Sequence, residues 1–343
     1  VPPISFNPVR GAAMRLILMN NNSYPRVGDR PQEQRLRRTR TKMDEGRVSD
    51  RQLREAENMT ITEVVREQIA AGMEIVTDGM VRWHDPVSHL AGQLENVGLG
   101  GLRRYFDSNF LYREPVVEGI PRWVKPVLGE DLEHARNNST RPVKGILTGP
   151  YTTARCSRVN DQGLESVGDL TLAFAEAFAN EVQVMAEAGA KIIQIDEPAI
   201  LAHPGDIGLL REAMGILAAK KGDAQLSLTT YFGDAAKLYG DFQDMPVEIL
   251  GFDFTYSEDL ISNIEMVGSS KVLALGLVDG RNTKMEDLED VFRSFDRILP
   301  RVSVDHCYLT PSCGLEFLPR DRARRKLELM TTLRFRYSKA GGR

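Results

Sequence analysis

The feature that most constrains the fold of this chain is a series of short apolar runs, each ending in a polar or turn-forming cluster. Most runs are continuously apolar and do not alternate, which is typical of strands buried on both faces of a parallel sheet. We expect eight strands, at Arg15–Met19, Met73–Val76, Val143–Leu147, Lys191–Ile195, Leu226–Phe232, Val247–Phe254, Val272–Val278 and His306–Leu309.

Helical patterns lie between these runs. Apolar residues recur near the helical period over 170–185 and over 285–298, and Thr283 with Glu286 resembles a capping box that would begin the second helix. Eight strands separated by helices favour a closed barrel, and no G-x-G-x-x-G motif follows the first strand to support a doubly wound sheet. The sequence therefore predicts an α/β fold, a (βα)8 TIM barrel forming a single domain over residues 1–343.

Two stretches would be additions to the strands and helices of a minimal barrel. Residues 30–58 are dense in Arg, Glu, Gln and Asp, and we interpret them as a solvated, N-terminal helical extension. Residues 84–140 carry scattered aromatic residues and prolines, and we interpret them as a long excursion after the second strand. Excursions on the C-terminal side of barrel strands often cover the active site.

Composition narrows the class of partner. The net charge of −4 gives the chain no electrostatic bias toward nucleic acid, and no apolar run is long enough to span a membrane. The first residues lack the basic-then-apolar pattern of a signal peptide, and three cysteines are too few for a disulfide framework. We expect a cytoplasmic protein with a small-molecule substrate.

Polar residues follow the strands at positions that would share one rim of a barrel. Any one of them would more often cap a helix or close a turn, but together they indicate an acidic pocket for a small polar molecule. They are Asn20 to Ser23, Asp78, Thr148, Asp196 with Glu197, Thr230, Asp253, Asp279 with Arg281, and Cys313.

Two of these positions are candidates for catalysis. Asp196 and Glu197 leave a strand side by side and point to opposite sides, so only one faces the pocket; a carboxylate there can bind an ammonium group or act as a base. Cys313 is a lone cysteine, commonly a structural residue, but its glycine neighbour and its place after the last strand keep a functional role equally open.

Several of these motifs together resemble cobalamin-independent methionine synthase. They occur in the family's order across most of the chain, and the single-barrel length is similar to that of the family's core members. The motifs are Ser23-Tyr24-Pro25-Arg26, Thr148-Gly149-Pro150, Ile193 to Pro198, Val278 to Asn282, and Cys313-Gly314-Leu315.

The resemblance implies a role for each matching residue. Ser23 would bind the carboxylate of homocysteine and Asp196 its amino group, and Cys313 would be a zinc ligand. We therefore predict Asp196 and Cys313 as catalytic residues, and a substrate pocket lined by Ser23, Asp78, Asp196, Glu197 and Asp253.

The chain also departs from the family pattern. Met80 stands where a second acidic residue would hold the amino group, and Cys156 where a tryptophan would stack on folate. The His-x-Cys pair of zinc ligands is replaced by Leu228-Thr229-Thr230-Tyr231, a stretch similar to the family's non-catalytic N-terminal barrel. Asp253 takes the place of the glutamate ligand, which leaves only Cys313 and Asp253 from the usual set.

Three hypotheses for function remain at this point. The first is a methyltransferase that moves a methyl group to a thiol such as homocysteine, with methyl-folate or a methylated corrinoid protein as the donor. The second is a non-catalytic relative that binds a small amino acid or a pterin. The third is another reaction on the same barrel, with Asp196 or Glu197 as the base.

The missing ligand pair leads to a prediction about zinc. Because no His or Cys lies between His203 and His306, we expect the purified protein to carry little or no zinc in the family's position. Elemental analysis tests this expectation. About one zinc per chain, lost when Cys313→Ser is introduced, would overturn it.

Overall fold

The computed structural model of the protein describes residues 14–160, 164, 166–257, 259–339 and 341. The start of the chain, where no signal peptide is expected, lies outside these residues. The chain forms two compact units: the first comprises Val1–Arg82, His134–Val143 and Phe252–Arg343, and the second Trp83–Glu133 and Lys144–Gly251. That residues 1–343 make up a single domain stays a prediction.

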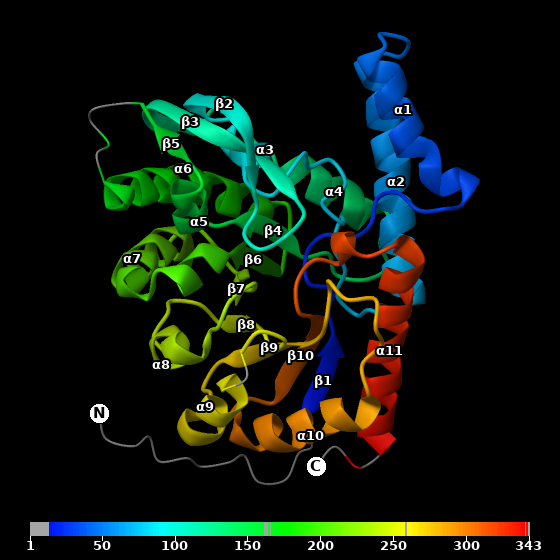
Figure 1. Ribbon diagram of the computed structural model, residues 1–343, viewed down its shortest axis with the longest axis vertical. Coiled ribbons are helices and arrows are strands. Elements are labelled where there is room, and N and C mark those ends of the chain that lie inside the picture. The colour runs from blue at the N-terminus through cyan, green and yellow to red at the C-terminus, as the bar shows by residue number, and fades with distance from the viewer. Residues whose placement is uncertain (1–13, 161–163, 165, 258, 340, 342–343) are drawn as a thin grey trace. The chain divides into compact units, whose positions relative to one another are not determined.

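Parallel strands form the core of the first unit. β1 (Arg15–Leu18) pairs with β10 (His306–Pro311), and β10 pairs with β9 (Val272–Val278), all in parallel. Figure 1 shows β1 in blue beside β10 in orange, although the two are far apart in sequence. Leu18 and Leu309, which are register partners, are both fully buried. β8 (Ile249–Asp253) crosses the boundary between the two units.

The second predicted strand, Met73–Val76, is wrong as a continuous strand. It forms only single parallel bridges, from Ile75 to Met19 and from Val76 to Val143. The buried side chain of Gln68 fixes the residue that follows this segment: its amide nitrogen donates to the Thr77 carbonyl and its amide oxygen accepts from the Thr77 N–H, both at 2.9 Å. A side-chain amide thus takes the place of a ladder partner at Thr77.

The first unit also contains several helices, of which α11 packs against β1 and β10. The predicted N-terminal helical extension is confirmed, since α1 and α2 cover most of residues 30–58, and Ser49 caps α2. The capping box expected at Thr283 is wrong, because α10 begins after Asp287, whose side chain accepts from the N–H groups of Glu289 and Asp290. The helices are η1 (Pro31–Gln34), α1 (Arg35–Asp44), α2 (Asp50–Ala70), α9 (Leu260–Val267), α10 (Leu288–Ile298), η5 (Leu299–Arg301), η6 (Leu315–Phe317) and α11 (Arg320–Lys339).

Strands of the second unit belong to two sheets. In one, β6 (Ile192–Asp196) pairs in parallel with β4 (Gly145–Thr148) on one side and with β7 (Gln225–Thr230) on the other. β4 and β6 are buried along their whole length. The second sheet accounts for the excursion predicted at 84–140: β2 (Glu95–Arg104) and β3 (Leu111–Arg122) form an antiparallel hairpin, and β5 (Arg158–Val159) joins β3 in parallel.

The helices of the second unit are mostly short, apart from α6 and α7. They are α3 (Ser88–Ala91), α4 (Gly129–Asn137), α5 (Pro150–Arg155), α6 (Val167–Glu187), η2 (Pro198–Ala202), η3 (Pro204–Asp206), α7 (Ile207–Ala218), η4 (Ala236–Leu238) and α8 (Tyr239–Gln243), with α4 reaching into the first unit. None of the helices in the described part of the chain has the length and apolar character needed to cross a membrane. Parallel strands alternating with helices confirm the predicted α/β class.

A buried carboxylate on α6 fixes the segment that follows β3. Glu181 is fully buried and accepts hydrogen bonds from the Trp123 indole at 2.7 Å, from the Val127 N–H at 2.9 Å and from the Leu128 N–H at 3.0 Å. Burial raises the pKa of this carboxyl, and the three donors oppose that shift. These donors would be left unsatisfied without it.

We predict that Glu181→Ala lowers the free energy of unfolding by about 3 kcal/mol, because buried donors to a charged acceptor lose their partner. Chemical denaturation of the variant and the parent protein measures the loss. Glu176→Ala, an exposed position on the same helix, is the matched control and should change stability by less than about 0.5 kcal/mol. Equal effects of the two variants would contradict this account of Glu181.

Candidate functional site

In the first unit, three segments pack against one another: the loop after β1, the turn after Val76 and the turn after β10. The Tyr24 N–H donates to the Gly79 carbonyl at 3.1 Å, and the Thr77 hydroxyl donates to the Asn22 carbonyl at 2.6 Å. The Leu315 N–H donates to the Ser23 carbonyl at 3.1 Å. The exit loop of β1 is therefore held between the turn after Val76 and the turn after β10, as the rim of a parallel α/β sheet requires.

Ser23 lies at the centre of this arrangement. Its side chain is 1% exposed, and its N–H donates to the Asn22 side-chain oxygen at 2.6 Å. A Cβ at Gly314 would overlap both the Ser23 hydroxyl and the Asn22 side-chain oxygen. Glycine is therefore needed after Cys313 so that the β10 turn can approach Ser23 closely.

Asp78 lies in the neighbouring turn. Its carboxylate is 8% exposed and accepts a hydrogen bond from the Met80 N–H at 3.0 Å. Burial raises the pKa of Asp78, and the Met80 N–H and the Arg82 guanidinium oppose this shift. Met80 has a φ of 53°, a left-handed backbone conformation that is strained for a residue other than glycine.

Cys313 and Asp253 complete the set in the first unit. Burial raises the pKa of the Cys313 thiol well above its usual value, and the charge of Asp253 raises it further. Cys313 is therefore a neutral thiol in the absence of a bound cation. Asp253 is 1% exposed and accepts from the Thr255 N–H at 2.9 Å and from the Thr255 hydroxyl at 2.6 Å, an arrangement that fixes its carboxylate at the end of β8.

In the second unit, Asp196 ends β6 and is 1% exposed. The Gln194 amide donates to one of its carboxylate oxygens at 2.7 Å, and the Tyr231 hydroxyl lies 3.4 Å from the other. The Tyr231 hydroxyl is also 3.1 Å from the Tyr105 hydroxyl, which the β2–β3 hairpin supplies. Asp196 is thus an oriented, buried carboxylate, which suits it to bind a cationic group.

A buried lysine that sequence reasoning missed supports Asp196. The Lys144 ammonium donates to the Gln194 side-chain oxygen at 2.6 Å, so that Gln194 links Lys144 to Asp196. Burial lowers the pKa of Lys144 to about 7, and the charge of Asp196 opposes that shift. A lysine directly before the buried strand β4 is the sequence signal that could have found it.

Glu197 turns away from Asp196, as expected for neighbouring residues at a strand end. Its carboxylate accepts from the N–H groups of Tyr151 at 2.9 Å and Thr152 at 2.6 Å, in the first turn of α5. Burial raises the pKa of Glu197 to about 7, and these donors oppose the shift. The carboxylate is used to satisfy a helix terminus, and its predicted role in binding substrate stays a prediction.

The structure thus brings part of the predicted pocket together within each unit. Ser23, Asp78 and the Cys313–Gly314 turn adjoin one another in the first unit, where Asp253 also acts on Cys313. Asp196 and Glu197 belong to the second unit. That all of them line one cavity stays a prediction.

The described residues do not fit the family's zinc site. No group of three or more His, Cys, Asp or Glu side chains in the described part of the chain is placed to hold a metal ion. Leu228 to Tyr231 lie in and directly after β7, where they supply no imidazole and no thiolate. With Cys313 and Asp253 as the remaining candidates, the donor set falls short of four tetrahedral ligands.

Comparison with known proteins gives consistent matches. The family described as "Cobalamin-independent synthase, Catalytic domain" matches residues 25–334. A methionine synthase of Saccharolobus solfataricus is 30% identical over 306 residues, which cover 89% of this chain and 91% of that protein. These matches extend over nearly the whole of the described chain.

Solved structures show the same fold. A B12-independent methionine synthase from Shewanella sp. W3-18-1, in complex with selenomethionine, has a TM-score of 0.77 at 20% identity and covers 95% of this chain and 98% of that chain. A putative vitamin-B12 independent methionine synthase from Listeria monocytogenes has a TM-score of 0.73 at 15% identity, covering 95% and 99%. The predicted TIM-barrel fold class is therefore confirmed by structural likeness.

The pKa of Lys144 leads to a prediction about stability and pH. Because the folded pKa of about 7 lies below the unfolded value of 10.5, the unfolded chain binds the extra proton between these limits. The free energy of unfolding should therefore gain a contribution from Lys144 that rises with pH in this window, by up to about 1.4 kcal/mol per pH unit.

Denaturation of the parent protein and of Lys144→Met at pH 7.5, 8.0 and 8.5 measures this contribution. The difference in unfolding free energy between parent and variant should increase in favour of the parent as the pH rises. Parallel pH dependences for the two proteins would show that Lys144 keeps an ordinary pKa.

Proposed function

Because the chain belongs to the family of cobalamin-independent synthase catalytic domains, we propose that it transfers a methyl group to the thiol of a small amino acid such as homocysteine. The observation that carries the proposal is the convergence of the Ser23, Asp78 and Cys313 segments in the first unit. These are strand-end segments that match the family's motifs, with the exception of Met80.

In this proposal Ser23 binds the carboxylate of the amino acid and Asp196 binds its ammonium group. Asp196 suits this role because it is a buried carboxylate oriented by Gln194. A charge-assisted hydrogen bond from the ammonium would compensate for the burial of the Asp196 charge. Met80 offers no second carboxylate, so we expect weaker amino-acid binding than in relatives that keep both acids.

The thiol must lose its proton before it attacks the methyl group, because the thiolate is the nucleophile. No step is assigned to zinc, since the donor set does not fit it. We assign the proton to Asp253, a fixed and buried carboxylate that acts electrostatically on Cys313. The thiolate sulfur then bonds to the methyl carbon, and the bond between that carbon and the donor breaks with its electron pair leaving on the donor.

The donor in this proposal is methyl-folate or a methylated corrinoid protein. Both can release a methyl group to a thiolate. Cys156 occupies the position at which, by the resemblance, a tryptophan would stack on folate. Assays with each donor, followed by detection of the methylated thiol, distinguish the two.

We predict that Ser23→Ala and Asp196→Asn each weaken the binding of L-homocysteine by about 10- to 100-fold, because a hydrogen bond to a charged group contributes about 1.5–3 kcal/mol. Isothermal titration calorimetry with reduced L-homocysteine measures the affinities. Ser262→Ala, on α9 and bonded only to the exposed Arg297 in the contacts described, is the matched control. Unchanged affinity in both site variants would refute the proposed orientation.

A further inference from the structure

Tyr24, which directly follows Ser23, has its hydroxyl group buried against a charged partner. The side chain is 1% exposed, and the hydroxyl donates to the Glu67 carboxylate on α2 at 3.2 Å. Burial and the negative charge of Glu67 both raise the pKa of Tyr24, so the hydroxyl stays protonated and remains a donor. Tyr24 is therefore tied by its backbone to Gly79 and by its side chain to α2.

Glu67 also binds Arg320, the first residue of α11. The Arg320 Nε lies 3.1 Å from Glu67 Oε2, and its Nη2 lies 3.0 Å from Glu67 Oε1, so the ion pair is bidentate. The Arg320 side chain is 1% exposed. A buried guanidinium is tolerated only with a charged partner in good geometry, so Arg320 and Glu67 hold each other in place.

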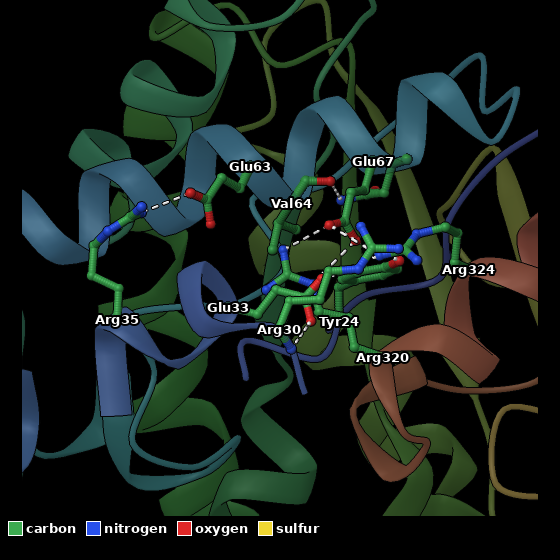
Figure 2. A network of polar contacts seen from close by, with 10 residues as sticks. Tyr24, Arg30, Glu33, Arg35, Glu63, Val64, Glu67, Arg320 and Arg324 are labelled. Carbon is green, nitrogen blue, oxygen red and sulfur yellow. Dashed lines mark hydrogen bonds and ion pairs between the residues drawn. The ribbon is translucent and has the colours of Figure 1, made fainter. Parts of the chain in front are cut away.

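A further arginine supports the same carboxylate from its outer side. Arg324 lies 3.3 Å from Glu67 and 3.5 Å from Glu33 of η1, and Figure 2 shows these side chains gathered beneath α2 with Tyr24 and Arg320. The Arg324 side chain is 23% exposed and marks the solvent side of the network. We call Tyr24, Glu67, Arg320 and Arg324 the exit-loop clamp.

The exit-loop clamp connects two segments of the candidate site. Tyr24 belongs to the loop after β1, and Arg320 follows the Cys313–Gly314 turn and η6 along the chain. These two segments meet at Ser23, where the Leu315 N–H bonds the Ser23 carbonyl and Gly314 leaves no room for a Cβ. A shift of the Tyr24 hydroxyl would therefore be transmitted to the neighbouring Ser23 hydroxyl.

We propose that the exit-loop clamp positions a residue of the amino-acid site. The hydrogen bond from Tyr24 to Glu67, which Arg320 holds in place, determines the position of the Ser23 hydroxyl. This role rests on the function proposed for Ser23. The backbone bonds of the loop fix its path, whereas binding a carboxylate needs the hydroxyl within about 0.5 Å of its productive place. The clamp provides this second level of support without contacting the ligand.

Tyr24→Phe tests the proposal, because it removes the hydroxyl and keeps the ring that fills the core. We measure the affinity for reduced L-homocysteine by calorimetry in the parent protein, Tyr24→Phe, Ser23→Ala and the double variant. We expect Tyr24→Phe to weaken binding about 5- to 10-fold in the parent and by less than 2-fold in the Ser23→Ala background. Such non-additivity is the sign that one residue acts through the other.

Two further variants make the test independent of stability. Arg35→Gln breaks the 2.7 Å pair with Glu63, which also lies on α2 but in none of the described contacts of the clamp, and should leave the affinity unchanged. Arg324→Gln removes the outer partner of Glu67 and should weaken binding by about 2-fold, again only when Ser23 is present. It serves as the clamp variant if Tyr24→Phe does not fold.

The outcomes separate the clamp from the proposed function. Equal weakening by Tyr24→Phe with and without the Ser23 hydroxyl would overturn the positioning role and show a general loosening of the fold. Weakening by Ser23→Ala alone would overturn the clamp and leave the proposed site intact. Failure of the parent protein to bind, or of Ser23→Ala to weaken binding, would overturn the proposed function and the clamp with it.

Discussion

Burial of polar loop segments is the constraint on which the rest of this structure depends. Loops normally lie at the surface, where water satisfies their polar groups. Here Asn20, Ser23 and Thr77 follow strand positions and are at most 1% exposed. Their groups must therefore find partners in the protein, and they do so in neighbouring exit segments, as in the bond from the Thr77 hydroxyl to the Asn22 carbonyl. The same bonds that satisfy these loops hold the candidate site in one conformation.

Buried charged groups also find their partners within the protein, in both units. Arg320 is paired with Glu67 in the first unit, and Lys144 reaches Asp196 through Gln194 in the second. An apolar residue of similar volume could fill the same space at either position, and it would avoid the cost of removing a charge from water. Lys144 is linked through Gln194 to Asp196, and Arg320 is linked through Glu67 to Tyr24, the neighbour of Ser23. The family resemblance assigns Asp196 and Ser23 to the ligand. Buried charge that supports a site, and does not contact the ligand itself, is a common way to orient functional side chains.

The sequence predicted the repeating strand and helix pattern because continuous apolar runs are a local signal. It failed at Met73–Val76, which forms only single bridges, and at the β2–β3 hairpin, whose first strand carries glycines and is mostly exposed. Candidate residues such as Ser23 and Asp196 followed from their motifs. The exit-loop clamp was missed because its members are distant in sequence: Tyr24, Glu67 and Arg320 come from three separate segments. Side-chain pairs of this kind have no local pattern to reveal them.

The central claim is that Ser23 and Asp196 recognise an amino acid in a family member that has no His-x-Cys pair at Leu228 to Tyr231. The most direct measurement is a crystal structure of the protein with L-methionine, the product of methyl transfer to homocysteine. The account predicts that the methionine carboxylate accepts a hydrogen bond from the Ser23 hydroxyl and that its ammonium group contacts Asp196. Methionine bound elsewhere, with the Ser23 hydroxyl and the Asp196 carboxylate engaged only by the protein, would contradict it.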